Sequence, residues 1–199
     1  MIMRTYKYEE ILGEEVLNKF TDKQREKISE LILGQDYGFF IDVKKICEIL
    51  GIAIEEGKLF DNLDINDSGK YIAETKTILF NPIEHGNRRR FTIAHELGHA
   101  VFNHSGESFR TQIPEKYNDV ISKMNETAAN NFAAQLLMPV KLIEILMLES
   151  INKHEYNSEL LSSEELKVII SEVAKELKVS EIALNYSIKN NGLIKEDLV

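Results

Sequence analysis

The sequence predicts an α+β protein that is mostly helical and contains a small β-sheet. Apolar residues recur at helical spacing through most of the chain, whereas two short runs between residues 69 and 80 have the composition of strands. The chain has 199 residues, of which 43% are hydrophobic and 29% are charged. These are ordinary values for a globular protein of one sizeable domain with a short appendage.

The first predicted helices lie in residues 1–34 and 42–50. In the first segment the apolar spacing predicts one or two amphipathic helices. In the second, Asp42 suits the N-cap and Gly51 suits the position after the helix. Cys47 is the only cysteine, so no disulfide can form within the chain, and we interpret it as a small buried apolar side chain.

The predicted sheet follows these helices. A short strand is expected at residues 52–55, and a hairpin at residues 69–73 and 75–80. The polar stretch between Asp61 and Asp67 lacks the spacing of an EF-hand and is interpreted as a solvated loop. After the hairpin, helices are expected at about 90–104, 120–138 and 140–148, and two or three more in residues 162–199.

The end of the chain resembles a helix-turn-helix. In this interpretation a turn at Val179 and Ser180 separates two packed helices, whose apolar side chains are Ala174, Leu177, Ile182, Leu184 and Ile188. Residues 162–199 carry seven acidic side chains against five lysines and no arginine. Phosphate attraction is therefore weak, and we favour packing or partner binding over direct DNA binding.

The charge and the hydropathy pattern bound the possible functions. There are 33 acidic residues against 24 basic ones, for a net charge of -9, which excludes a general nucleic-acid binder. The N-terminus lacks the apolar core of a signal peptide, and polar residues interrupt the most apolar region, residues 132–148. We therefore expect a soluble, cytoplasmic protein without a membrane span.

Residues 95–99 read His-Glu-Leu-Gly-His within an otherwise apolar helical stretch. Positions four apart lie about 40° apart around a helix, so His95 and His99 face one side and could share a metal ion. Glu96 is poorly aimed as a ligand, but it could accept a proton from a water molecule that the metal activates. Surface or hydrogen-bonded histidines without a metal are the alternative interpretation of these five residues.

A catalytic zinc site needs a third protein ligand, and Glu126 is the strongest candidate. Ala129 and Ala133 follow it at helical spacing, and small residues allow two helices to approach closely. The alternative is an exposed glutamate on an ordinary helix. The glycine and histidine of the metzincin motif are absent after His99, which excludes that class. His104 is a weaker candidate because it points to a different side of a continuing helix.

Two segments together resemble the ImmA/IrrE family of metallopeptidases. Residues 90–99 read Arg-Phe-Thr-Ile-Ala-His-Glu-Leu-Gly-His, and residues 125–139 read Asn-Glu-Thr-Ala-Ala-Asn-Asn-Phe-Ala-Ala-Gln-Leu-Leu-Met-Pro. The resemblance covers roughly residues 39–139. It implies a zincin-like metallopeptidase domain, which we place at 35–150. The N-terminal 38 residues and the tail after Pro139 match no family motif, and the apolar spacing alone predicts an N-terminal helical segment at 1–34 and a C-terminal helical segment at 151–199.

By residue matching, the resemblance implies that His95, His99 and Glu126 bind Zn²⁺ and that Glu96 is the catalytic general base. It implies a cytoplasmic endopeptidase whose protein target is a helix-turn-helix repressor. Manganese or iron also suits such a ligand set. A non-catalytic zinc-containing regulator that binds a partner is the alternative function, and a DNA-binding repressor is a weaker third.

Two further groups of side chains have more than one interpretation. Tyr71, His104 and Tyr117 are candidates for the hydrogen-bond donor that steadies an oxyanion, and each also suits a structural role. The arginines at residues 88–90 precede the predicted metal-bearing helix, where positive charge opposes the helix dipole. They could bind an acidic substrate segment, pair with nearby carboxylates, or lie in a solvated loop.

Overall fold

The computed structural model describes residues 4–58, 61–64, 66–103 and 118–194. Helices form most of it, together with two small sheets, which confirms the predicted α+β class. The elements are β1 (Thr5–Lys7), α1 (Tyr8–Ile11), α2 (Glu14–Leu17), α3 (Asp22–Ser29), β2 (Ile32–Gly34), α4 (Val43–Leu50), β3 (Ala53–Glu56), β4 (Gly69–Ile72), β5 (Thr77–Phe80), α5 (Gly86–Val101), α7 (Asn118–Leu137), α8 (Val140–Lys153), α9 (Ser163–Leu177) and α10 (Glu181–Asn190).

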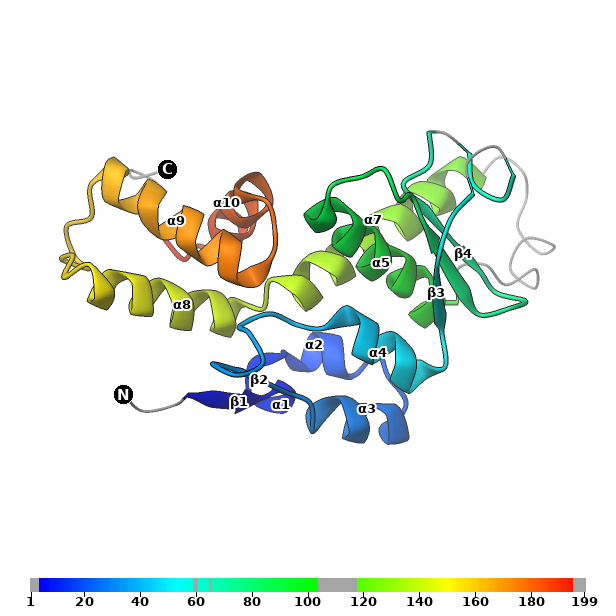
Figure 1. Cartoon of the computed structure of the whole chain (residues 1–199), viewed down its shortest axis with the longest axis horizontal. Coiled ribbons are helices and arrows are strands. Elements are labelled where there is room, and N and C mark those ends of the chain that lie inside the picture. Colours follow the sequence, from blue (N-terminus) through cyan, green and yellow to red (C-terminus); the bar gives the residue numbers. More distant parts are fainter. Residues whose placement is uncertain (1–3, 59–60, 65, 104–117, 195–199) are drawn as a thin grey trace.

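Helices α7 and α8 run in succession through the middle of the molecule (Figure 1). The three-stranded sheet and α5 lie at one end of this pair, α9 and α10 lie at the other, and the N-terminal elements lie along one side. In the sheet, β5 is central, with β3 parallel on one side and β4 antiparallel on the other. The predicted hairpin is therefore present as β4 and β5, and β4 is an edge strand.

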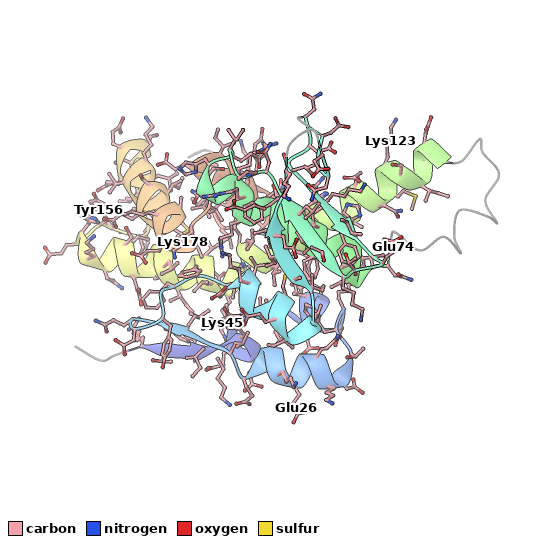
Figure 2. The ribbon with its side chains drawn as sticks, turned by 45° about the vertical axis from the view of Figure 1, so that its right-hand side comes forward. Glu26, Lys45, Glu74, Lys123, Tyr156 and Lys178 are labelled. Atoms are coloured by element: carbon pink, nitrogen blue, oxygen red, sulfur yellow. The ribbon has the colours of Figure 1, made fainter. Side chains whose placement is uncertain are left out.

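Within the described residues, one cluster of buried apolar side chains joins the N-terminal, central and C-terminal elements. It includes Tyr8 from α1, Ile46 from α4, Leu97 from α5, Leu136 from α7 and Ile169 from α9. The three segments at 1–34, 35–150 and 151–199 thus share one core, and their division into domains stays a prediction. Charged side chains such as Glu26, Lys45 and Glu74 point outward around this core (Figure 2).

The predicted ends of α4 are confirmed. The carboxylate of Asp42 accepts the backbone N–H groups of Lys44 and Lys45, and Gly51 ends the helix with a left-handed φ of 70°. Cys47 is fully buried, and burial raises the pKa of its thiol to about 12. The side chain therefore belongs to the core, as its apolar neighbours predicted.

The N-terminal segment is more complex than the predicted one or two helices. It contains three short helices, and its ends pair as the antiparallel strands β1 and β2. The apolar side chains up to Ile28 are buried as their spacing predicted, but Ile32 lies in β2 and is 40% exposed. A strand of three residues has too little period to be distinguished from the end of a helix.

Three further helix predictions need correction. Helix α5 begins at Gly86 rather than near residue 90 and ends at Val101, before the predicted end at 104. Helix α8 continues past residue 148 to Lys153. In the C-terminal pair, Ile182 does not pack as predicted, because it is 72% exposed, whereas Leu184 and Ile188 are buried.

No single helix of the described residues is long and apolar enough to cross a membrane. Residues Asp119–Leu137 and Val140–Lys153 meet the criteria of length and composition only when taken together, and they are bent by 41° at the break between them.

Candidate metal centre

The candidate site lies where α5 packs against α7. A Cβ atom at Gly98 of α5 would lie 3.1 Å from the Cα of Ala129 on α7, so the two backbones are almost in contact. Ala129 and Ala133 are fully buried in this contact. The small side chains permit the close approach that the sequence predicted, and they bring Glu126 opposite the histidines of α5.

His95, His99 and Glu126 converge on one point. The Nε2 atoms of the two histidines are 3.1 Å apart. Glu126 reaches both, with Oε2 at 3.3 Å from His95 Nε2 and Oε1 at 3.4 Å from His99 Nε2. Among the described residues these three side chains form a group whose ligand atoms all lie within 4.8 Å of one another.

These separations fit a metal ion better than they fit a network of hydrogen bonds. Ligand atoms bound at ~2.0–2.1 Å to a tetrahedral zinc ion lie ~3.3–3.4 Å from one another. The two distances from Glu126 match that spacing, and both exceed the usual length of an N–H···O bond. The donor set of two imidazoles and one carboxylate is also one that zinc prefers.

Asn130 orients the first histidine. Its Oδ1 lies 3.0 Å from Nδ1 of His95, and because an amide oxygen can only accept, this contact is a hydrogen bond in the tautomer of His95 that carries its proton on Nδ1. The lone pair of Nε2 then faces His99 and Glu126. Histidines that bind metals usually donate their other ring N–H in this way, so Asn130 fits a supporting role at the site.

Glu96 lies beside the cluster but outside it, as the helical geometry predicted. Its Oε2 accepts the backbone N–H of Tyr71, at 2.8 Å, which ties α5 to the edge strand β4. Burial is the main cause that raises the pKa of Glu96, to about 7; the Tyr71 bond opposes this shift, and the nearby carboxylates of Glu126 and Asp67 add to it. Gly69 allows this contact, since a Cβ there would collide with Thr92.

The cluster opens into a cleft of about 900 Å³ between α5, α7 and β4. Tyr71 lines this cleft beside Glu96, and burial raises the pKa of its phenol. The other two candidates for steadying an oxyanion, His104 and Tyr117, lie outside the described residues. Lys70 and Arg88 also line the cleft, so both signs of charge occur on its walls.

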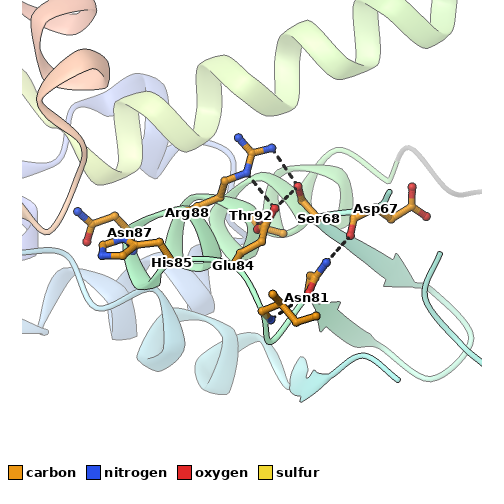
Figure 3. Close-up of polar contacts among 9 residues, drawn as sticks. Asp67, Ser68, Asn81, Glu84, His85, Asn87, Arg88 and Thr92 are labelled. Carbon is orange, nitrogen blue, oxygen red and sulfur yellow. Dashed lines mark hydrogen bonds and ion pairs between the residues drawn. The ribbon is translucent and has the colours of Figure 1, made fainter. Parts of the chain in front are cut away.

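A polar network forms the wall of the cleft near the start of α5 (Figure 3). Arg88 donates from Nε to Glu84 at 2.9 Å and from Nη2 to Ser68 at 3.1 Å. Ser68 and Thr92 donate to the same Glu84 carboxylate. Of the interpretations offered for this arginine, pairing with a nearby carboxylate is therefore the one realised within the chain.

Arg90 has a different environment, which the sequence did not reveal. Its guanidinium donates to the carbonyls of Leu177 at 2.7 Å, Lys178 at 3.1 Å and Ile41 at 2.6 Å, and it faces the Phe40 ring at 5.4 Å. Burial lowers its pKa to about 10. The prediction of a solvated loop is wrong here, because α5 already includes Arg90 and this arginine binds the C-terminal end of α9.

The profile of the IrrE N-terminal-like domain family matches residues 47–189, which is more than half of the chain. The chain belongs to the ImmA/IrrE family of metallopeptidases. This membership confirms the resemblance that the two motifs indicated. The metal ligands and the general base stay predictions, now with a geometry that suits both roles.

This ImmA/IrrE family member is also similar to individual proteins. It is 37% identical over 79 residues to the radiation response metalloprotease IrrE of Deinococcus deserti, a match that covers 40% of this chain and 28% of that protein. A solved Mycobacterium tuberculosis transcriptional regulator is 15% identical, with a TM-score of 0.49, covering 74% of this chain and 39% of the other. The chain thus corresponds to well under half of either protein.

Asn130 is the site residue whose role the sequence reasoning missed. It follows Glu126 by four positions, so the two side chains lie on one face of α7. That spacing, combined with the usual need of a metal-bound histidine for a second partner, is the signal that could have identified it.

Proposed function

We propose that this chain is a zinc-dependent endopeptidase that cleaves a helix-turn-helix transcriptional repressor in the cytoplasm. The observation that carries the proposal is the convergence of His95, His99 and Glu126 beside Glu96, in an open cleft. Membership of a metallopeptidase family supports the chemistry. Three protein ligands are typical of catalytic zinc sites, whereas structural sites are closed by four.

Each side chain has a defined part in the proposed reaction. His95, His99 and Glu126 hold the metal, and Asn130 keeps His95 in the ligating tautomer. A bound zinc ion supplies a Lewis acid, which polarises a carbonyl and lowers the pKa of water from about 15.7 toward 7. Glu96 accepts the proton of the attacking water and later delivers it to the leaving amine nitrogen.

Tyr71 is our candidate for the donor that steadies the developing oxyanion. It lines the same cleft as the ligands, and its backbone already lies against Glu96. A phenol with a raised pKa stays protonated at neutral pH, so it can donate a hydrogen bond there.

The repressor as substrate rests on the family resemblance. Direct DNA binding by α9 and α10 is disfavoured because acidic residues outnumber lysines in residues 162–199, so we propose that this chain reaches gene regulation through a protein partner.

The test compares the wild type with Glu96→Gln in the cells that carry the gene. We expect both proteins to bind about one zinc per chain, because Glu96 is not a ligand. We expect new protein N-termini, detected by mass spectrometry, only with the wild type, and one of them should lie within a DNA-binding repressor.

The alternative of a non-catalytic regulator makes the opposite prediction. If Glu96→Gln relieves repression as well as the wild type, and neither protein produces new N-termini, the peptidase proposal is wrong and partner binding explains the activity.

A further inference from the structure

A second hollow, of about 820 Å³, lies at the C-terminal end of α7. It surrounds the α7–α8 break, with α10 on one side and the α1–α2 turn on the other (Figure 1). We call it the junction groove and define it by Glu15, Asn131, Gln135, Glu144 and Tyr186 among its lining residues.

The junction groove adjoins the metal cleft. Phe91 and Asn130 line both hollows, and Asn130 is the side chain that contacts His95. Along α7, Glu126 lines the cleft, Asn130 lines both, and Ala134 and Met138 line the groove. These positions are four residues apart and thus follow one face of the helix.

The distance along α7 between the metal ligands and the junction groove determines how many substrate residues would separate the two sites. Helix α7 rises 1.5 Å per residue, so Met138 lies ~18 Å along the axis from Glu126. An extended polypeptide covers that distance in roughly five or six residues. A substrate held at the metal ligands could therefore place a residue about five positions away in the junction groove.

The groove walls suit a polypeptide segment. The side-chain amides of Asn131, Gln135 and Asn190 line it, and each offers both donors and acceptors to an extended backbone. Tyr186 is 66% exposed and Val140 is 38% exposed, so both present apolar surface to an occupant. Large aromatic side chains of this kind often anchor protein interfaces.

The charge of the groove selects the kind of segment. Three carboxylates line it, from Glu10, Glu15 and Glu144, against the single ammonium group of Lys141. Glu10 also accepts the backbone N–H of Lys7, and the structure gives Glu15 and Glu144 exposed positions. This excess of negative charge attracts lysine and arginine and opposes acidic segments.

We propose that the junction groove binds a lysine- or arginine-rich segment of the protein substrate, roughly five residues from the bond at the metal ligands. The inference rests on the proposed peptidase function and adds the chemistry that selects the substrate. A repressor that neutralises DNA phosphates carries such basic segments, whereas DNA itself is repelled by the same carboxylates.

The experiment measures binding separately from cleavage. Its probe is a fluorescein-labelled peptide of sixteen residues in which lysines alternate with small polar residues, and the matched probe carries glutamates instead. The groove variant combines Glu15→Lys with Glu144→Lys. The control combines Glu26→Lys with Glu48→Lys, which changes the net charge equally at exposed positions of α3 and α4. Figure 2 labels Glu26.

We expect the wild type to bind the lysine peptide at least tenfold more tightly than the glutamate peptide at physiological salt. The groove variant should lose at least tenfold in affinity for the lysine peptide, while the control stays within about twofold of the wild type. Equal losses in both variants, or no preference of the wild type for lysine, would overturn the proposal. Circular dichroism melting curves identify a variant that fails to fold, in which case Glu144→Gln replaces it and a loss of at least threefold is expected.

Mass spectrometry of the same zinc-loaded mixtures distinguishes this inference from the proposed function. Binding with the expected lysine preference but without cleavage supports the groove and counts against the peptidase. Cleavage of both peptides at equal rates supports the peptidase and contradicts the groove.

Discussion

Two glutamates in this molecule each contact histidine, but their surroundings differ: one faces candidate metal ligands and the other accepts hydrogen bonds. On α7, Glu126 faces two imidazole nitrogens at 3.3 and 3.4 Å. Between α8 and α9, Glu172 accepts from Lys153 at 2.6 Å, Ser150 at 2.7 Å and His154 at 3.0 Å. The first carboxylate is 54% exposed and the second 32% exposed, so burial alone does not separate them.

The difference lies in what the partners supply. Lys153 and Ser150 bring protons to Glu172, and these bonds lower the pKa of its carboxyl to about 2. At Glu126, the Nδ1–H tautomer of His95 that Asn130 favours turns the lone pair of Nε2 toward the carboxylate, and a metal ion would bind both groups. Contact between a histidine and a glutamate is thus not enough to indicate a metal site: at Glu172 the surrounding side chains donate hydrogen bonds to the carboxylate and leave no place for a metal ion.

Substituting the two glutamates gives the largest contrast. Glu126→Ala removes one of three proposed ligands, so zinc affinity should fall by more than about 100-fold. Elemental analysis of protein purified without chelator should find near-stoichiometric zinc in the wild type and little in this variant. Glu172→Ala is the matched control and should keep its zinc. Zinc loss in both variants would mean that the loss is not specific to Glu126. Absence of zinc from the wild type would contradict the proposed metal site.

Arg90 is a third charged side chain in this comparison, and like Glu172 it has all its partners within the protein, here three backbone carbonyls. Arg90→Met leaves three carbonyls without their donor, so unfolding should require about 3 kcal/mol less than in the wild type. Urea denaturation of both proteins measures this loss. Arg89→Met is the control, since Arg89 only faces the Phe80 ring at 5.9 Å and its loss should cost under about 1 kcal/mol. Equal costs would mean that the carbonyl bonds contribute little.

Asn130→Ala tests whether Asn130 holds His95 in the tautomer that can bind a metal through Nε2. Loss of the bond to His95 Nδ1 should weaken zinc binding by about 10- to 100-fold while the three ligands remain. Competition with a chromogenic chelator gives the affinity directly. Asn130→Asp should restore most of it because its carboxylate also accepts from Nδ1. If Asn130→Ala binds zinc as tightly as the wild type, the supporting role of Asn130 is wrong.

The smallest expected effect belongs to Glu172, and it depends on pH. Its pKa is lowered in the folded protein, so its stabilisation is complete above the unfolded value near 4.3 and is lost as the pH falls toward about 2. Glu172→Gln should therefore lower the free energy of unfolding by about 1 kcal/mol at pH 7. Urea titrations should show this difference shrinking at pH 3; a constant difference would assign it to packing instead of charge.

Local rules predicted much of this fold and site. Asp42 and Gly51 end α4 as expected, and His95 and His99 share a face because four residues nearly complete one helical turn. Contacts between distant parts of the chain were harder to predict. The acceptors of Arg90 lie at Ile41 and Leu177, and neither position carries a sequence signal for an arginine partner.

The errors have physical causes of the same kind. β1 and β2 pair across 25 residues and are too short to show a period. Ile182 suits the apolar face of α10 by spacing, but among the described residues no element covers it and it is exposed. The position of Glu126 opposite α5 had a signal in the sequence, because the small side chains of Ala129 and Ala133 allow two helices to approach closely, and the structure shows that they do.

The bonds of α5 to the turn between α9 and α10 bear on how the chain can be shortened. Asn87 donates to the carbonyl of Val179 at 2.9 Å, and Arg90 binds the two carbonyls before it. A chain cut after residue 150 would keep every proposed ligand, but the buried guanidinium of Arg90 would lose two of its three carbonyl acceptors and keep that of Ile41. The C-terminal helices α9 and α10 therefore complete the surroundings of α5, and shortened versions of the chain should extend at least to Lys189, where the match to the family also ends.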